Sequence, residues 1–491
     1  MRKPLGSLTK NVAFYGAGDV AVTAAGLVLL PIYLRVLTEA DFGAIALLLA
    51  VETIVKLLFR WGLDGAFMRY YLDYPDDRAR AELASTLWIF LGIASGILLV
   101  ALWMAAPALA HHLFKDAADT YLPSLQLILI NMYLLTFTFV PFHVMRMRQH
   151  AGTFAAFTFG RSVSTLVLRI VLVLGLDWGV FGLYVADVAV TVAVLPLLWP
   201  WMRPLWRPAL SGETLRRCLR FGLPRLPHGL AQQALDAGNQ YLLSRFVPLD
   251  RQGVYQIGMT IGRGTKLFLS AFETGWAPFY YETARTPDAR TTLSKVSTYG
   301  LAVLALLVAG SVAVASDLIA WLTPDSYQDA ALVVPLIALG IALQGVYLIT
   351  SIGLNITSKT QYYPLSTFAA ATVGLGSGWW LMPRFGITGA AAAFALAYAT
   401  LALVAGWFSR QHYPMRYERG RLIRILVAAV VAPVVAMALP TMPPVAGVAA
   451  RGLTTVLVFT GLLGVGGFFR PTELAWLRQA WSARLRRRRD A

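Results

Sequence analysis

The fold is decided by residues 221–282, which read FGLPRLPHGLAQQALDAGNQYLLSRFVPLDRQGVYQIGMTIGRGTKLFLSAFETGWAPFYYE. This stretch holds two apolar segments of membrane-spanning length, 221–245 and 254–277, joined by a short loop. Ionisable residues recur inside both segments. At membrane depth such a residue is costly unless it meets a partner or water, so each one is a candidate for function.

The first segment carries a polar stripe. Arg225, Gln232, Asp236 and Asn239 follow one another at steps of seven, four and three residues, which places them on one helical face. On a helix surrounded by lipid, such a polar stripe would be exposed to hydrocarbon at a high free-energy cost, so we expect it to line an aqueous cavity. Two roles are open for Asp236: an ion pair with Arg225 or Arg263, or the binding of a coupling H⁺ or Na⁺.

The second segment carries a similar stripe of Gln256, Arg263, Lys266, Ser270 and Glu273. Arg263 and Lys266 lie one turn apart and repel each other unless an anion sits between them. A phosphate or pyrophosphate fits this geometry, because arginine forks onto phosphate oxygens and lysine supplies a point charge. We therefore predict that these two cations bind substrate and that Glu273 is a further coupling candidate.

The composition excludes most soluble classes. Only 14% of the 491 residues are charged and 57% are hydrophobic, whereas soluble domains carry about 25% charged residues. The single cysteine, Cys218, excludes an internal disulfide and a cysteine metal cluster. No histidine spacing, nucleophile motif or phosphate-binding loop indicates a metal, an enzyme or a cofactor, so we expect a transporter that binds no ATP.

Fourteen segments satisfy the length of about 20 apolar residues that a crossing needs, so we predict an all-α polytopic membrane protein. They are 9–33, 41–59, 84–106, 122–142, 153–175, 180–200, 221–245, 254–277, 296–316, 332–354, 364–382, 387–408, 423–441 and 449–469. The first is too long for a signal peptide. With both termini in the cytoplasm, 30 of the 42 lysines and arginines fall in cytoplasmic segments and four in the opposite loops, as the positive-inside rule requires.

The same distribution explains the net charge of +17 without nucleic acid. The basic loops face anionic membrane lipids, which are therefore expected partners. The basic tail, 470–491, is predicted to be an amphipathic cytoplasmic helix or a simple topology anchor.

The chain repeats itself with an offset of 210 residues. Seven of 37 aligned positions are identical, and they include Gly43 with Gly253 and Lys56 with Lys266. A second match aligns Trp178–Gly182 with Phe385–Gly389. The repeat predicts two six-helix lobes of the same orientation, related by a pseudo-two-fold axis along the membrane normal. We expect the lobes at 1–200 and 221–408, a cytoplasmic linker at 201–220, and two extra helices within 421–469.

The first lobe adds its own candidates. Lys56 is the counterpart of Lys266 and is predicted to assist in binding substrate. Glu52 lies four residues before it, so the two side chains either form a structural pair or act separately, with Glu52 as a coupling acid. Asp19 is another coupling candidate.

Other intramembrane arginines have less specific predictions. Arg161 and Arg169 are structural or reach an interface, Arg35 and Arg245 near helix ends snorkel to the surface, and Arg451 at a helix start is interfacial. None of these is counted among the substrate contacts, which we predict to be Arg225, Arg263, Lys266, Lys56, Gln232 and Asn239.

Several motifs, in this order, resemble those of bacterial polysaccharide and O-antigen flippases. They are the apolar run from Asn11 to Pro31 followed by Tyr33-Leu34-Arg35 and Asp41-Phe42-Gly43, then Gly62-Leu63-Asp64-Gly65-Ala66 with Arg69-Tyr70-Tyr71, then Leu223-Pro224, Gly253-Val254-Tyr255, and Trp276-Ala277-Pro278-Phe279-Tyr280.

The resemblance places the chain in the multidrug/oligosaccharidyl-lipid/polysaccharide exporter superfamily. It implies two lobes in a V, a cationic cavity and alternating access. It also implies transport of undecaprenyl-pyrophosphate-linked oligosaccharide across the bacterial inner membrane, with a glycan polymerase and glycosyltransferases as pathway partners. One departure is that Ala237 follows Asp236, where many members carry arginine, so the charge partner of Asp236 stays open.

Three rival functions are weighed against this one. A lipid II flippase of the same superfamily shares the span count and the cationic cavity. A drug/cation antiporter usually has twelve spans and an acidic cavity. A membrane glycan polymerase or ligase tends to have a large extracytoplasmic loop, and no such loop is expected here.

Overall fold

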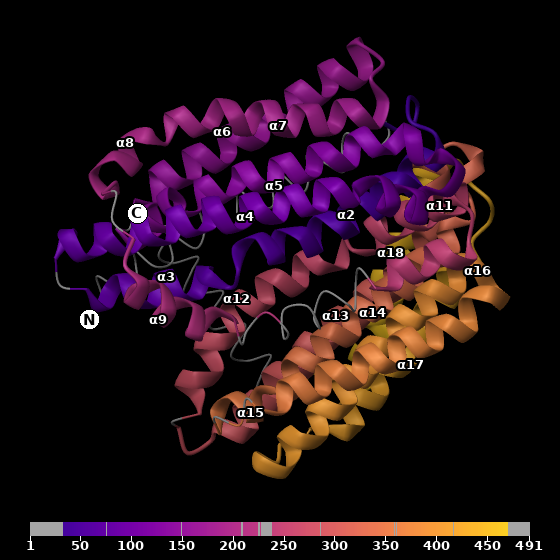
Figure 1. The fold of residues 1–491 in the computed structure, drawn as a ribbon. Coiled ribbons are helices and arrows are strands. Elements are labelled where there is room, and N and C mark those ends of the chain that lie inside the picture. Colours follow the sequence, from indigo (N-terminus) through magenta and orange to yellow (C-terminus); the bar gives the residue numbers. More distant parts are fainter. Residues whose placement is uncertain are drawn as a thin grey trace, which may run out of the picture. The chain divides into compact units, whose positions relative to one another are not determined.

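The computed structural model describes residues 33–469 apart from residues 75, 149, 208–209, 224–225, 227–237, 285, 358, 360 and 416. Every regular element in this part of the chain is a helix (Figure 1). The expected span at 9–33, most of the span at 221–245 and the expected tail at 470–491 lie outside the described residues.

The described helices fall into two compact units, Met1–Ile257 with Pro364–Ala397, and Gly258–Tyr363 with Tyr398–Ala491. The first unit contains α2 (Glu39–Arg60), α3 (Leu63–Asp73), α4 (Asp77–Phe114), α5 (Ala118–Met147), α6 (Ala151–Ile170), α7 (Gly179–Leu197), α8 (Trp199–Met202), α9 (Gly212–Gly222), most of α11 (Leu249–Gly262) and the middle of α16 (Tyr362–His412). The second contains α12 (Thr265–Thr283), α13 (Ala289–Leu322), α14 (Ala330–Thr350), α15 (Ile352–Ile356), the rest of α16, α17 (Arg419–Met437) and α18 (Pro444–Val465).

Nine helical stretches of the described chain are long and apolar enough to cross a membrane. Two of them, of 69 and 51 residues, are each long enough to cross twice. The first contains α4 and α5, and the second is α16, whose helical path breaks at Gly386. The protein is therefore an all-helical, multi-pass membrane protein. The count of fourteen spans stays a prediction.

One expected span differs from the prediction. The helix predicted over 254–277 is divided into α11 and α12 by a turn at Arg263 and Gly264. In this turn the amides of Gly264 and Lys266 bond to carbonyls three residues back, at 2.9 and 2.8 Å. The glycine favours the break because it is a poor helix former.

Both parts of the sequence repeat have structural counterparts within the first unit. In the aligned pair of motifs, Gly179 and Gly386 each adopt a left-handed backbone, with φ of 51° and 54°. Three residues later, a Cβ on Gly389 would overlap the backbone of Leu381, and a Cβ on Gly182 would press against the Cβ atoms of Trp178 and Leu172. The two helical hairpins therefore turn by the same device, since only glycine adopts this conformation without strain.

The second counterpart is a reciprocal helix contact. A Cβ on Gly43 of α2 would overlap the carbonyl oxygen of Leu249, and a Cβ on Gly253 of α11 would overlap that of Glu39. Glu39 and Leu249 are themselves 210 residues apart. Each repeat thus presents the same glycine to the same position of the other, which is the contact that a two-fold axis generates.

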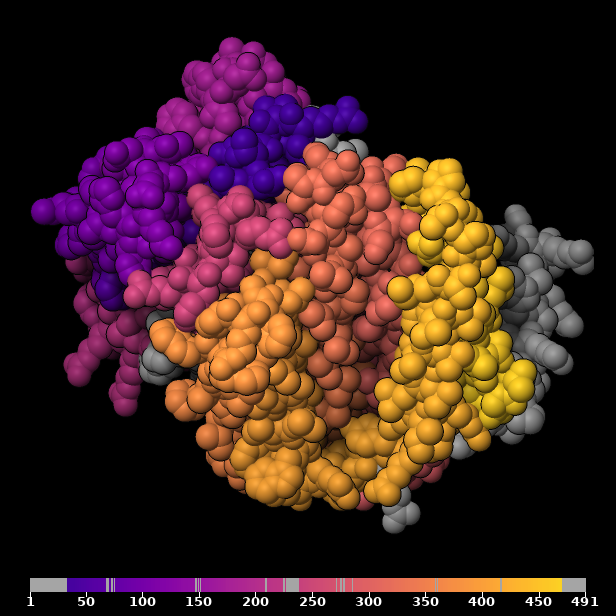
Figure 2. Space-filling model, turned by 90° about the vertical axis from the view of Figure 1, so that its right-hand side faces the viewer, coloured from indigo at the N-terminus to yellow at the C-terminus, as the bar shows by residue number. Residues whose placement is uncertain are grey.

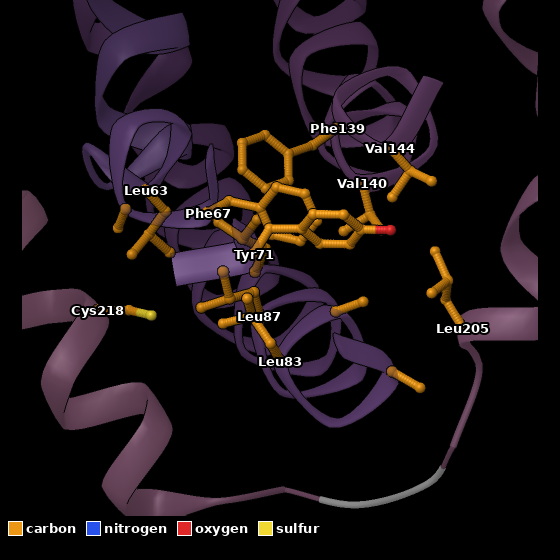
Figure 3. Packing of buried hydrophobic residues seen from close by; sticks show 14 residues of the cluster. Leu63, Phe67, Tyr71, Leu83, Leu87, Phe139, Val140, Val144, Leu205 and Cys218 are labelled. Atoms are coloured by element: carbon orange, nitrogen blue, oxygen red, sulfur yellow. The ribbon is translucent and has the colours of Figure 1, made fainter. Parts of the chain in front are cut away.

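An aromatic core joins α3, α4, α5 and α9 (Figure 3). Phe67 lies at its centre, with its ring centroid 5.4 Å from that of Tyr71 and 5.7 Å from that of Phe139. The α9 helix is amphipathic: Cys218 is buried in this core, whereas Arg216 and Arg220 are exposed. The segment predicted only as a linker therefore contains a helix held to the first unit by apolar packing.

In the second unit, α13, α17 and α18 pack around a separate core that includes Ile425, Phe459 and Phe468. Helix α18, yellow in Figure 2, runs along one flank of this unit. The prediction that Arg451 is interfacial is wrong, because Arg451 of α18 forms an ion pair with Asp317 of α13, and both side chains are nearly buried. Gly447, one turn earlier, leaves room for this carboxylate.

Candidate functional site

Helix α2 presents the first group of ionisable residues. Its start is stabilised by a capping box between Thr38 and Asp41. Lys56 has an exposed side chain and Glu52 is half-buried. The two residues interact electrostatically, but no direct ion pair joins these two described side chains. The interpretation as a closed structural pair is therefore not supported.

Arg169 and Asp187 form the best-defined ion pair of the first unit. The guanidinium of Arg169 on α6 donates two hydrogen bonds from Nη2 to the carboxylate of Asp187 on α7, at 2.7 and 2.8 Å, and a third from Nε at 3.1 Å. Asp187 is only 15% exposed. A forked pair of this kind satisfies both charges inside the membrane, so Arg169 has a structural role.

Asp187 was missed in the sequence. A signal was present, because it is the only acidic residue of the span 179–197 and follows Arg169 by one hairpin. A buried carboxylate in an apolar helix needs a cationic partner, and the preceding helix of a hairpin is the nearest source.

Arg161 and Lys56 remain as cations without such a partner. Neither forms an ion pair with another side chain in the described part of the chain. Both interact electrostatically with Glu52 and with each other. Asp187 also acts on Arg161 but is already paired with Arg169. Glu52 is thus the one further acid that acts on both Lys56 and Arg161, so the charge of this described group favours an anionic ligand.

A second acid lies at the end of α2. Asp64 accepts a hydrogen bond from Arg60 Nη1 at 2.9 Å and lies 3.6 Å from Nε2 of His143. These residues neutralise one another at the turn between α2 and α3, so Arg60 is not available as a further free cation. The pair is partly exposed and contributes little to stability by itself.

Asn239 lies inside the first unit. It is 5% exposed, and its amide donates to the hydroxyl of Tyr255 at 3.0 Å and to the carbonyl of Ala390 at 3.2 Å. Both amide hydrogens are therefore used within the fold. This arrangement favours a role in holding three helices together over the expected substrate contact.

The second unit contains Arg263, Lys266 and Glu273. Arg263 is half-buried at the turn before α12, whereas Lys266 and Glu273 have exposed side chains on α12. Neither Lys266 nor Glu273 pairs with an opposite charge among the residues that the structure describes. Arg263 lies in the turn, whereas Lys266 lies at the start of α12. The two cations therefore do not share one continuous helical face, as the prediction had them.

Four predicted site residues lie outside the described residues, namely Arg225, Gln232, Asp236 and Asp19. Within the described ranges, no group of three or more histidine, cysteine, aspartate or glutamate side chains could hold a metal ion. The described part of the chain therefore presents cations that pair with none of its carboxylates, namely Lys56 and Arg161 on helices of membrane-spanning length and Lys266 on α12.

Comparison with known proteins places this geometry in context. Residues 32–271 match the family described as "Polysaccharide biosynthesis protein". A search of curated protein sequences gave no match. The solved structure "Lipid II flippase MurJ, inward closed conformation" is similar with a TM-score of 0.72 and 12% identity over 93% of this chain and 99% of that one.

An inward-facing multidrug resistance MATE family transporter of the MOP superfamily is also similar, with a TM-score of 0.61 and 16% identity over 79% of this chain and 94% of that one. At these identities the likeness shows the fold alone. The fold is therefore similar to that of the MurJ flippase and of the MATE transporters.

Proposed function

We propose that this chain, a member through residues 32–271 of the polysaccharide biosynthesis protein family, is a flippase for undecaprenyl-pyrophosphate-linked oligosaccharide. It moves an O-antigen or exopolysaccharide repeat unit from the cytoplasmic to the outer leaflet of the bacterial inner membrane by alternating access. The observation that carries the proposal is that Lys56 and Arg161, on helices long and apolar enough to cross a membrane, and Lys266 on α12 form no ion pair with any residue that the structure describes.

The physical argument concerns the free-energy cost of placing a cation inside the membrane. A cation at membrane depth is retained only where it meets an anion or water. Arg169, Arg60 and Arg451 each meet a carboxylate of the fold. Lys56, Arg161 and Lys266 do not do so within the described chain, so they are suited to a ligand that brings its own negative charge. A pyrophosphate supplies several oxygens to such groups, while its lipid tail stays in the bilayer.

In this proposal Arg225, Arg263 and Lys266 hold the pyrophosphate. Lys56, with Arg161 near it in the first unit, assists in binding substrate. Gln232 contacts the sugar. Asp236, Asp19, Glu52 and Glu273 are the candidates for binding H⁺ or Na⁺, and Glu52 interacts electrostatically with Lys56 and Arg161. A half-buried acid beside cations couples proton binding to anion binding, because each changes the local charge that the other meets.

The proposal is tested by replacing cations in a strain that lacks the chromosomal gene. Arg263→Gln with Lys266→Gln, and separately Lys56→Gln with Arg161→Gln, should abolish surface glycan. Each charged hydrogen bond contributes about 1.5–3 kcal/mol, so the loss of two weakens binding by about a hundredfold or more. Surface glycan and the accumulated lipid-linked precursor are both measured, at equal membrane expression.

The matched control is Lys359→Gln with Arg410→Gln, which removes the same charges from exposed positions outside the helix interiors. It should leave surface glycan unchanged. Normal surface glycan in both cavity variants would rule the assignment out.

A lipid II flippase is the second candidate, since the fold is similar to one that carries that name. Complementation of a strain depleted of its peptidoglycan flippase distinguishes the two. We expect no rescue of growth, and rescue would replace the oligosaccharide substrate with lipid II.

A further inference from the structure

A preformed apolar pocket lies at one end of the first unit, away from the charged residues described above. Its volume is about 480 Å³, within the range of about 300–1,000 Å³ that is usual for small-molecule sites. The walls are Trp88 of α4, Phe137 of α5, and residues at the end of α7 and in α8 that include Trp199 and Met202. Every lining side chain is apolar.

The walls are fixed by neighbouring contacts. The indole nitrogen of Trp88 donates to the carbonyl of Phe137 at 3.3 Å, and Trp88 packs edge-on against Trp206 with ring centroids 5.0 Å apart. Leu198 is almost fully buried, while Trp199 is half-exposed at the entrance. The pocket therefore exists before any ligand binds, which lowers the entropic cost of binding.

A basic segment is held beside this pocket. Ser85, on α4 one turn before Trp88, donates to the carbonyl of Leu205 and accepts from the amide of Arg207, both at 2.8 Å. Thr86 accepts from the amide of Ser211 at 3.1 Å. Arg203 and Arg207 are exposed. Arg203 and Arg207 therefore give the segment that directly follows the pocket residue Met202 a positive charge.

The position of the pocket indicates the kind of ligand. Its residues lie in the first third of α4 (Trp88), in the second half of α5 (Phe137) and at the end of α7. The distribution of positive charge assigns these parts of the three helices to the cytoplasmic side. Tryptophans are enriched at this depth, where head groups meet acyl chains. An apolar cavity with exposed arginines at its rim matches a molecule that has an acyl chain and an anionic head group, and the inner leaflet is rich in such lipids.

We propose that this pocket is a specific binding site for an anionic phospholipid of the cytoplasmic leaflet, with one acyl chain between Trp88 and Trp199 and the phosphate at Arg203 and Arg207. The bound lipid would fasten the segment 199–211 to α4, and through it α9 to the first unit. The proposal is independent of the transported substrate.

The test uses the full-length protein in nanodiscs and a phosphatidylglycerol that carries a photoactivatable group on one acyl chain. After irradiation, we expect labelled peptides that contain Trp88 and residues 195–202. Unlabelled phosphatidylglycerol should compete, whereas phosphatidylcholine and undecaprenyl phosphate should not. Arg203→Gln with Arg207→Gln should weaken this competition by about thirtyfold, because each arginine near an anionic lipid contributes about fivefold in affinity.

Arg410→Gln with Arg419→Gln is the matched control, since it removes two exposed arginines from the second unit. It should change the affinity by less than about twofold. Trp199→Ser should reduce labelling of the pocket while leaving the arginines in place. Equal competition by phosphatidylcholine, equal binding by the Arg203/Arg207 variant, or preferential competition by undecaprenyl phosphate would each overturn the proposal.

Discussion

At the scale of the residue, an ion-pair partner distinguishes a structural charge from a charge that can bind a ligand. Arg169 and Arg161 are both arginines of α6, and the sequence offers no reason to treat them differently. In the structure Arg169 forks onto Asp187, while Arg161 has no such carboxylate in the described chain. The difference arises from a residue on another helix, so it depends on tertiary contact and not on local pattern.

Cys218 supplies a prediction with a defined pH dependence. Burial raises the pKa of its thiol from 9.0 to about 11, and only 1% of the residue is exposed. Only about one thiol in a thousand is therefore ionised at pH 8, and the thiolate is the reactive form. Alkylation by maleimide should be slow at pH 8 and should accelerate about tenfold per pH unit up to about pH 11.

The comparison is Leu210→Cys in a Cys218→Ser background, because Leu210 is 58% exposed on the adjacent loop. Mass spectrometry of the modified protein gives both rates. Because the pKa is higher in the folded state, the stability that this thiol contributes is present below pH 9 and declines as the pH rises toward 11. Equal reaction rates for the two cysteines would contradict the burial of Cys218.

At the scale of the element, glycines determine how closely two helices approach each other. The reciprocal contact of Gly43 and Gly253 brings α2 and α11 together with no space for a side chain at either position. Gly43→Ala and Gly253→Ala should each lower the stability of the purified protein by about 1–3 kcal/mol, since overpacking forces the backbones apart. Thermal unfolding in detergent measures the change.

The reciprocal contact also predicts how the two substitutions combine. Once one alanine has separated the helices, the second should cost less, so the double variant should be less destabilised than the sum of the single changes. Gly160→Ala in α6 is the control, because nothing lies within 4 Å of its added Cβ. Melting temperatures of all three glycine-contact variants equal to that of the control would contradict the contact.

At the scale of the whole molecule, the main prediction concerns the side of the membrane on which each loop lies. The exposed Lys359 precedes α16, the exposed Arg410 lies in its last turn, and the exposed Arg384 lies beside its break at Gly386. If α16 crosses the membrane twice, its two ends face the cytoplasm and the break faces outward. In a Cys218→Ser background, an impermeant maleimide applied to intact cells should label Arg384→Cys but not Lys359→Cys or Arg410→Cys. Lys115→Cys, between α4 and α5, should be labelled like Arg384→Cys.

Permeabilised cells provide the control, because all four cysteines should then react. Labelling of Lys359→Cys from outside would mean that the orientation is reversed or that a span has been miscounted, since one missing crossing inverts every later loop.

Much of the architecture could be predicted because membrane-spanning helices satisfy their own backbone hydrogen bonds and must be long and apolar. The expected segments 84–106, 122–142 and 296–316 each lie within a helix of the structure, and 332–354 covers most of α14 and the start of the short α15. The glycines of the repeat also stood out, because a left-handed turn or a close backbone approach excludes other residues. The prediction of one helix over 254–277 missed the break at Gly264, because hydropathy does not detect a turn within an apolar segment.

By itself, the sequence determined the class of the protein, its helices, its repeat and the sign of the charge on its intramembrane faces, since each follows from local composition or periodicity. The tertiary structure alone decided which charges of residues 221–282 and of the equivalent first-lobe segment have partners. Asn239, a predicted substrate contact, is a buried link between helices, whereas Lys56 and Lys266 form no ion pair with the residues that the structure describes. Pairing depends on distance between helices far apart in the chain, and no local pattern encodes that distance.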